Sequence, residues 1–525
     1  MKYPIGIQSF DQIIGDGYVY VDKTGLIYQL VKGGKIYFLS RPRRFGKSLL
    51  VSTLKCYFQG RKELFKGLAI DKLETDWAEY PVFHIDFSQT DFLNPNLLEE
   101  KLEENISAWE QIYGKGEFAF SLGSRFAYVL KQAHKQSGRR CVVLIDEYDK
   151  PVVDALGTGL KIKKDINELL LETYYKQLLG SFYSTLKASD EDLHFILITG
   201  MTRFTQATPF SGFNNFSDIS TDRRYETLCG ITQEELEHYF AEPIKALAVK
   251  YKVTEEGMLD MLKHRYDGYH FSGNLTDVYN PFSLLNAFAK KALRDYWFSS
   301  STPTYLVRLL NHTQEDLNEL TGRYYRPEEF IDYKADVEKP LPMIYQSGYL
   351  TVKSYDRDFG TFLLDFPNNE VKSGFVSLVA SSYLKPRENL QSWIRSAVIA
   401  LRQGDTEQLR TLFTSFLADI PYTMRDKREK ERYFHYTFYL IFRLISVYTV
   451  YTEKEQSQGR SDCIVETDDY IYIFEFKRDG SADEALAQIE AKGYARPYEA
   501  DKRKLYKIGV NFSSETGTVE EWKVG

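Results

Sequence analysis

The sequence has few of the residues that build thiol or imidazole sites. Its four cysteines are scattered and include no CxxC pair, so we expect free thiols in a reducing compartment rather than a zinc clamp or a redox couple. The eight histidines form no HExxH motif or other ligand-spaced cluster, which argues against a histidine-rich metal site. The chain also has no internal repeat and no low-complexity linker.

The sequence also lacks a segment suited to a membrane. Its first residues, MKYPIGIQSFDQIIGDG, hold acidic side chains and no apolar core, so we expect no signal peptide. The most apolar stretch, residues 436–451, contains Arg443 and is too short to span a bilayer, so it predicts a buried helix. We therefore expect a cytoplasmic protein with no membrane partner.

The charge balance argues against a protein that coats nucleic acid nonspecifically. The net charge is −7, and neutralising phosphates requires clustered lysine and arginine. Any contact with DNA or RNA must then be local, and solvated helix faces are the better interpretation of the second and fourth basic clusters. The four clusters are residues 41–44, 161–164, 427–432 and 502–507.

The length of 525 residues, with 43% apolar and 27% charged residues, is typical of a globular protein of two or three domains.

Hydrophobic patterning predicts an α/β protein with a parallel sheet in its first part. Five β-rich runs alternate with helical patterns there, and the third and fourth runs are apolar enough to be central strands. The runs are residues 35–40, 81–88, 141–147, 194–200 and 224–231. Later runs predict a strand pair, a helix and a last strand near the C-terminus, at residues 461–466, 470–477, 483–494 and 505–512.

These patterns predict four segments along the chain. The first, residues 1–231, is a parallel-sheet domain, and residues 232–350 form a helical lid or middle region. Residues 351–385 supply connecting strands. Residues 386–525 form a second α/β domain.

The segment SRPRRFGKS at residues 40–48 has the context of a Walker A loop, between an apolar strand and a helical run. In such a loop, backbone N–H groups and a helix N-terminus converge on phosphate oxygens. Lys47 would reach the β and γ phosphates of ATP, and the Ser48 hydroxyl would hold Mg²⁺. The match is incomplete, because Arg41 stands where the standard pattern has glycine. The remaining residues expected to bind nucleotide are Arg44, Phe45, Gly46 and Leu49.

The run VVLIDE supplies the second half of such a site. Asp146 would hold the Mg²⁺ shell and Glu147 would polarise the attacking water. Acidic residues that merely end a core strand are common, but the two halves occur in the correct order with a further strand between them. Thr199, in the ITGMTR run, would sense the γ-phosphate, although a threonine at a strand end is more often structural.

A second constellation lies near the C-terminus, in the run IFEFK. Glu475 and Lys477 are two residues apart, so a strand would place them on one face. Asp462 opens the preceding predicted strand, and two carboxylates on neighbouring strands can share Mg²⁺, or Mn²⁺. The Phe476 carbonyl would complete the metal ligands, and Lys477 would activate the attacking water.

This D…ExK pattern resembles the signature of PD-(D/E)XK phosphodiesterases. Gln488, in the following predicted helix, matches the polar position that this superfamily often places beside its site. Glu431, in a helical run upstream, resembles its additional acidic residue, with Glu429 as an alternative.

Six segments together resemble the AAA-ATPase-like family of bacterial proteins, in which the ATPase is commonly fused to a C-terminal PD-(D/E)XK nuclease-superfamily domain. The segments are SRPRRFGKSLL, VVLIDEYDKP, ITGMTRFT, RYDGYHF, VYNPFSLL and YQSGYLTV. The resemblance covers essentially the whole chain. It implies that residues 1–231 are an AAA-like P-loop NTPase core and that residues 386–525 are the PD-(D/E)XK nuclease-like domain. It also implies that Arg41 is the family's own loop variant, and it supports the roles given to Lys47, Ser48, Asp146 and Glu147.

We therefore expect an ATP-hydrolysing protein whose Mg²⁺-dependent nuclease domain cleaves DNA or RNA under nucleotide control. The alternative is a signalling or scaffolding NTPase, switched by ATP, whose nuclease-like domain only binds nucleic acid. A third interpretation is a structural protein in which both sites are vestigial. The sequence leaves open whether the chain forms a homo-oligomer and which residue serves as an arginine finger.

Overall fold

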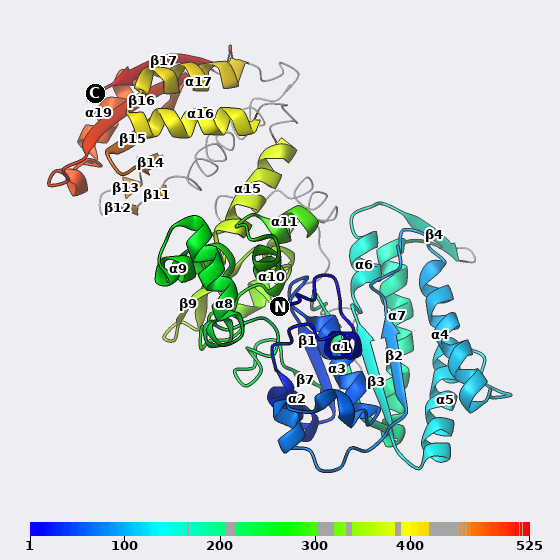
Figure 1. The fold of residues 1–525 in the computed structure, drawn as a ribbon. Helices are drawn as coiled ribbons and strands as arrows, with labels where there is room; N and C mark the ends of the chain where they lie inside the picture. The colour runs from blue at the N-terminus through cyan, green and yellow to red at the C-terminus, as the bar shows by residue number, and fades with distance from the viewer. Residues whose placement is uncertain are drawn as a thin grey trace. The chain divides into compact units, whose positions relative to one another are not determined.

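The protein divides into two compact units, Met1–Val371 and Lys372–Gly525, in a computed structural model. The structure describes residues 1–164, 167–204, 216–301, 320–331, 339–383, 390–418, 451–452, 455–456, 459–460, 463–513, 515–516 and 518–525. Each unit contains its own sheet (Figure 1). This confirms the predicted α/β class, with a parallel sheet in the first unit and a separate sheet in the second.

The first unit combines a parallel sheet, many helices and two smaller antiparallel sheets. Its strands are β1 (Ile36–Ser40), β2 (Val82–Asp86), β3 (Cys141–Asp146), β4 (Lys161–Lys164), β5 (Asn167–Leu170), β6 (Leu193–Gly200), β7 (Ser217–Asp218), β8 (Arg323–Tyr325), β9 (Thr351–Asp356) and β10 (Thr361–Asp365). Its α-helices are α1 (Phe10–Gly15), α2 (Thr24–Gly33), α3 (Lys47–Phe58), α4 (Leu97–Tyr113), α5 (Leu122–Ser137), α6 (Lys150–Ala155), α7 (Leu171–Ala188), α8 (Gln233–Tyr251), α9 (Glu255–Tyr266), α10 (Pro281–Lys290), α11 (Tyr296–Ser301), α13 (Pro327–Phe330) and α14 (Leu341–Gln346). Short 3-10 helices are η1 (Lys62–Phe65), η2 (Ala69–Lys72) and η3 (Asp190–Asp192).

The main sheet has the strand order β2-β3-β6-β1-β7, and all of its pairs are parallel. Helices cover both of its faces. The register pairs Phe83 with Val143 and Val142 with Phe195, so Phe83 and Phe195 point to opposite faces. Phe83 packs on Phe126 of α5, whereas Phe195 packs on Phe58 of α3. Burial on both sides explains why β3 is apolar along its length.

The prediction of a strand at residues 224–231 is wrong. This stretch consists of turns, and the fifth strand of the sheet is instead the short β7, which pairs with β1. The reason lies at Gly230, which has a φ of 96° and approaches another segment closely. A Cβ atom there would lie 2.1 Å from Cγ1 of Val278. The chain turns here to pack closely against the segment that precedes α10.

The middle of the first unit is built on a helical core. Helix α8 begins with a capping box, in which the Thr232 hydroxyl accepts from the Glu235 N–H and the Glu235 carboxylate accepts from the Thr232 N–H. Apolar side chains of α8, α9 and α10 form one buried cluster that includes Phe240, Leu262 and Phe288. The antiparallel sheet β8-β10-β9 completes this part of the unit.

The second unit contains a mixed sheet with the order β11-β14-β15-β16-β17. Its strands are β11 (Tyr451–Thr452), β12 (Glu455–Gln456), β13 (Gly459–Arg460), β14 (Cys463–Glu466), β15 (Tyr470–Arg478), β16 (Lys504–Phe512) and β17 (Val519–Val524). Its helices are α16 (Leu390–Gln403), α17 (Thr406–Ala418), α19 (Ala482–Ala491) and the 3-10 helix η6 (Arg496–Tyr498), and α15 (Asn369–Tyr383) begins in the first unit and continues into the second. The pair β15–β16 is parallel, and the other pairs in this sheet are antiparallel.

Alternation along β15 divides the second unit into two packing layers. Tyr472 faces α16, and its hydroxyl donates to the Leu401 carbonyl at 2.6 Å. Ile473, the next residue, packs in a cluster with Ile489 of α19. Glu475 shares the face of Ile473, so it lies on the side of the sheet that α19 covers.

None of the helices that the structure describes combines the length and apolarity needed to cross a bilayer. Residues 436–451, where we expected a buried helix, lie outside the described residues.

A buried carboxylate in the first unit leads to a prediction about pH. Asp267 is 1% exposed, and burial raises its pKa from 3.8 to about 7. A group whose pKa rises on folding stabilises the fold below its unfolded pKa, and this contribution is lost as pH rises through about 7. At about 1.4 kcal/mol per pH unit, ionisation of Asp267 costs up to about 4 kcal/mol. Asp267→Asn stays neutral, so its free energy of unfolding relative to wild type should increase between pH 5 and pH 8.

Urea unfolding of the full chain at the two pH values measures this difference. The matched control is Asp358→Asn, on the exposed turn between β9 and β10. An equal pH dependence in wild type and Asp267→Asn would contradict the assignment.

Candidate functional site

The loop between β1 and α3 has the backbone shape of an anion-binding site. It runs from Ser40, at the end of the strand, to Lys47, the first residue of the helix. Arg44 and Gly46 take left-handed conformations, with φ of 64° and 93°. Such alternation turns successive N–H groups toward one concavity, and the helix N-terminus adds partial positive charge. The loop is therefore suited to phosphate oxygens.

The Lys47 side chain lies against this loop. Its side chain is 4% exposed, and Nζ donates to the carbonyl oxygens of Arg41 at 2.9 Å and Pro42 at 3.1 Å. Ser48 and Leu49 follow in the first turn of α3, and both are half-buried. A cation held here would offset the charge of bound phosphates.

The carboxyl ends of three parallel strands meet beside the loop. The register pairs Ser40 of β1 with Gly200 of β6, and Ile145 of β3 with Ile198 of β6. Asp146, the last residue of β3, is buried and accepts a hydrogen bond from the Thr199 hydroxyl. Thr199 therefore orients the carboxylate that we expected near Mg²⁺.

Glu147 directly follows β3 and takes a left-handed conformation with φ of 52°. Burial raises the pKa of its carboxyl, while the nearby Lys47 ammonium lowers it. A side chain other than glycine, asparagine or aspartate in this conformation is uncommon and clusters at functional sites. A carboxylate with a raised pKa is a better proton acceptor, as a general base requires.

Asp149 is a residue at this edge that the sequence interpretation missed. It is buried and accepts hydrogen bonds from the Thr202 N–H and hydroxyl, both at 2.6 Å, and from the Met201 N–H at 3.1 Å. Gly200 allows this close packing, because a Cβ there would lie 2.6 Å from Cδ1 of Tyr148. The motif DEYDKP could have indicated this residue, since Asp149 is the third acidic residue at the end of a buried strand, after Asp146 and Glu147. It fixes the segment that follows Thr199.

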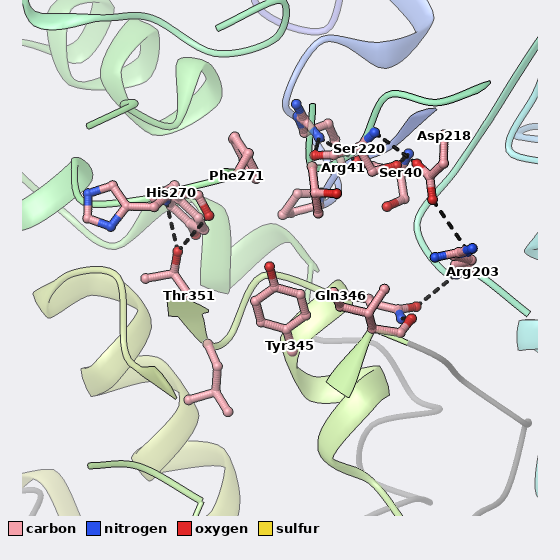
Figure 2. A pocket seen from close by; sticks show the side chains of 15 residues that line it. Ser40, Arg41, Arg203, Asp218, Ser220, His270, Phe271, Tyr345, Gln346 and Thr351 are labelled. Atoms are coloured by element: carbon pink, nitrogen blue, oxygen red, sulfur yellow. Dashed lines mark hydrogen bonds and ion pairs between the residues drawn. The ribbon is translucent and has the colours of Figure 1, made fainter. Parts of the chain in front are cut away.

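Arg41 explains the departure from the standard loop pattern. Its side chain is 1% exposed and donates to the carbonyl oxygens of Ser40 at 2.9 Å, Ser220 at 2.7 Å and Tyr225 at 3.2 Å. The guanidinium also lies 4.0 Å from the ring centroid of Phe271. Figure 2 shows this side chain directed at Ser220. Arg41 lines a cavity of about 40 Å³, and the Arg203–Asp218 ion pair lines the same cavity.

The rest of the loop packs on the middle of the unit. The Phe45 ring is buried and contacts Tyr269 and Phe271 edge-on, at centroid distances of 4.7 and 5.4 Å. The Arg44 guanidinium lies 4.0 Å from the Phe282 ring centroid. Phe45 and Arg44 were expected to bind nucleotide, but these contacts give both side chains a role in holding the loop.

An apolar cavity of about 100 Å³ lies beside Gly46. Its walls come from the N-terminal segment, the first turns of α3 and the turn before α8. They include Val19, Tyr20, Leu49, Leu50, Leu228 and Ile231.

In the second unit, three of the predicted residues lie together. Glu475 and Lys477 project from β15 toward α19, and the Lys477 Nζ is 3.7 Å from Oε1 of Glu475. Gln488 of α19 joins them, because its amide donates to the Glu475 carboxylate and its Oε1 accepts from the Lys477 ammonium. Glu475 is 1% exposed.

The predicted metal site is only partly within the described residues. Phe476 is described, and its ring packs at a tilt of 39° on Phe512 of β16, at a centroid distance of 5.8 Å. Asp462 and Glu431 lie outside the described residues. Within the described part of the chain, no group of three or more histidine, cysteine, aspartate or glutamate side chains is arranged to hold a metal.

Two residues of β16 that the sequence interpretation missed shape this site. Gly509 pairs with Glu475, and a Cβ there would lie 2.3 Å from the Ala482 carbonyl oxygen, so glycine lets α19 approach the sheet. Asn511 pairs with Lys477 and accepts a hydrogen bond from the Gly480 N–H at 3.0 Å. The sequence alone gives little indication of these two roles, because glycine and asparagine occur in strands for many other reasons.

Two known protein families match the chain, one in each of its two units. Residues 4–210 match a family described as "Predicted AAA-ATPase", and residues 429–522 match the PD-(D/E)XK nuclease superfamily. The chain is 35% identical over 526 residues to a protein of Azotobacter chroococcum mcd 1 named "Uncharacterized protein in vnfD 5'region". That similarity covers 99% of this chain and 98% of the relative.

The environment of Arg41 predicts that glycine cannot replace it. Arg41→Gly should lower the free energy of unfolding by about 3 kcal/mol, because hydrogen bonds from a charged donor contribute about 1.5–3 kcal/mol and buried carbonyls would lose their donor. The matched control is Arg44→Gly, at an exposed position whose left-handed backbone suits glycine, and it should change stability by less than about 1 kcal/mol. Calorimetric unfolding of the full chain compares them, and equal effects would refute this role of Arg41.

Proposed function

The chain belongs to the family of predicted AAA-ATPases that carry a PD-(D/E)XK nuclease-superfamily domain, and we propose that it hydrolyses ATP and cleaves DNA or RNA under nucleotide control. The observation that carries this proposal is the convergence of a lysine, two acidic residues and a threonine at one edge of a parallel sheet. Ligands of such sheets bind outside the carboxyl ends of the strands.

In the proposed ATP site, each residue has a distinct role. The backbone N–H groups of the loop bind phosphate oxygens, and Lys47 neutralises the β and γ phosphates. Ser48 and Asp146 hold Mg²⁺ and its water ligands, with Asp146 oriented by Thr199. Glu147 accepts a proton from the attacking water, a role supported by its burial and raised pKa.

The apolar cavity beside Gly46 is the proposed place of the base. Its walls are mainly aliphatic and aromatic, which suits the flat face of a nucleobase, and it lies next to the loop that would bind the phosphates. The turn Leu228–Ile231 forms one of these walls, so a bound nucleotide would contact both the sheet domain and the residues that lead into α8.

In the proposed nuclease site, Glu475, Asp462 and the Phe476 carbonyl hold Mg²⁺ or Mn²⁺. Oxygen ligands favour these hard cations over Zn²⁺. Lys477 acts on the attacking water, Gln488 positions Lys477, and Glu431 adds a further carboxylate. The support is the contact among Glu475, Lys477 and Gln488 on one face of the sheet.

A second function is favoured by the same contact. The Gln488 amide bridges Glu475 and Lys477, so both groups are already hydrogen-bonded within the protein. A site satisfied in this way is also compatible with an ATP-switched protein whose nuclease-like domain only binds nucleic acid.

The ATP site is tested by two substitutions with different expected effects. Lys47→Ala should weaken ATP binding about 10- to 100-fold, as expected for loss of a charge-assisted contact worth about 1.5–3 kcal/mol. Glu147→Gln should bind ATP normally and slow hydrolysis about 100-fold or more, because it keeps the shape and loses the base. Lys55→Ala, on the same helix as Lys47, is the matched control. Wild-type binding and turnover in both variants would remove the loop from the mechanism.

The nuclease site is tested with the full chain on single- and double-stranded DNA and RNA, with Mg²⁺ or Mn²⁺, with and without ATP. Lys477→Ala should bind Mn²⁺ normally but cleave about 100-fold more slowly, because the lysine acts on water and not on the metal. Asp462→Asn should weaken Mn²⁺ binding. Lys507→Ala, on neighbouring β16, is the control. If wild type binds Mn²⁺ and cleaves none of the substrates, the nucleic-acid-binding function replaces the nuclease.

A further inference from the structure

Trp297, in α11, contacts the loop at residues 40–47, which we call the phosphate loop because of its proposed function. Its side chain is 2% exposed, and the indole N–H donates to the Arg43 carbonyl oxygen at 3.0 Å. The indole ring also packs on Tyr349, with a centroid distance of 5.2 Å. The position of this tryptophan is therefore fixed on the loop side by a hydrogen bond and on another side by a buried ring.

The hydrogen bond acts on a peptide unit that matters for phosphate. The Arg43 carbonyl and the Arg44 N–H belong to the same peptide plane, which is trans, so they point in opposite directions. Fixing the carbonyl consequently fixes the direction of the N–H. Arg44 takes the left-handed conformation that gives the loop its concave shape. Trp297 thus determines how the loop presents one of its N–H donors.

Trp297 makes a second hydrogen bond through its backbone. Its N–H donates to Oε1 of Glu370 at 2.7 Å, and Glu370 is 1% exposed. Glu370 lies in the first turn of α15, whose start is held by Asn368, the acceptor for the Val371 N–H at 3.1 Å. The helix then continues past Val371, where the first unit ends. Two hydrogen bonds therefore connect the phosphate loop to the helix that leads into the nuclease-like unit.

We propose that Trp297 is a positioning residue of the phosphate loop and that, through Glu370, it couples nucleotide occupancy to helix α15. The proposal rests on the proposed ATP site and specifies how that site is regulated. Coupling of this kind is reciprocal: if the order of α15 favours the binding-competent loop, bound nucleotide must favour the order of α15 by the same factor. The coupling should therefore be visible both in ATP affinity and in the local stability of residues 369–383.

Trp297→Phe tests the link because it keeps an aromatic ring and removes only the N–H donor. In the full chain, ATP affinity should fall about 10-fold, while turnover at saturating ATP stays within about three-fold of wild type. In wild type, a non-hydrolysable ATP analogue with Mg²⁺ should slow amide hydrogen exchange at residues 369–383. In Trp297→Phe at saturating analogue, this slowing should be lost.

Trp393→Phe is the matched control, since the Trp393 indole also donates to a backbone carbonyl, that of Leu412, at 3.0 Å within the second unit. It should keep wild-type affinity and exchange. Glu370→Gln preserves an acceptor oxygen and should keep the response of α15, whereas Glu370→Leu should lose the response and, by reciprocity, lower ATP affinity by the factor by which the analogue stabilises α15 in wild type.

The outcomes separate this proposal from the proposed function. If wild type does not bind ATP, the ATP site itself is refuted, and the link with it. If wild type binds ATP but exchange at residues 369–383 does not change, the link is refuted and the ATP site stands. An unchanged exchange response in Trp297→Phe at saturating analogue also refutes the link.

Discussion

The buried guanidinium of Arg41 connects parts of the first unit that are far apart in sequence. It donates to carbonyls at the end of β1 and in the segment that follows β7, and it stacks on Phe271 from the middle of the unit. Burial of a cation is costly unless its donors are used, so the backbone around it must deliver carbonyl oxygens at the right positions. Within residues 224–231, the Tyr225 carbonyl is the one that meets this requirement, in addition to the close approach of Gly230 to Val278. The same requirement explains why the loop begins with arginine and not glycine.

Because Arg41, Phe45 and Arg43 all contact the middle of the unit, the phosphate loop belongs to two parts of the fold at once. The Arg43 carbonyl is held by the indole of Trp297, the Phe45 ring is held by aromatic side chains, and the last residue of the loop begins α3. A loop held in this way loses little conformational freedom when it binds phosphate. The same contacts mean that a change in loop geometry must be accommodated by α11 and the start of α15, and the proposed nucleotide control would use this route.

Local patterns were enough to predict the central strands and the groups at their ends. The apolar runs that became β1, β3 and β6 are buried on both faces, and GKS and DE follow strands whose parallel register brings Lys47, Asp146 and Thr199 to one edge. The roles of Arg41, Asp149 and Trp297 could not be predicted, because each depends on partners in distant segments that no periodicity reveals. The same holds for Gly509, whose importance comes from the close approach of α19. In the second unit, the sequence placed Glu475, Lys477 and Gln488 near one another, because a strand spacing of two and a following helix are local signals. Asp462 and Glu431 lie outside the described residues.

The Gln488 bridge constrains how a metal could act in the second unit. Glu475 is 1% exposed and accepts a hydrogen bond from the Gln488 amide, so a cation that coordinates the same oxygen would compete with that donor for its lone pairs. The other end of the same amide holds the Lys477 ammonium. Rotation of one side chain would therefore free the carboxylate for the metal and release the lysine toward the attacking water in a single movement. In the proposed nuclease site, the metal-binding carboxylate and the lysine would then both depend on the orientation of the Gln488 side chain.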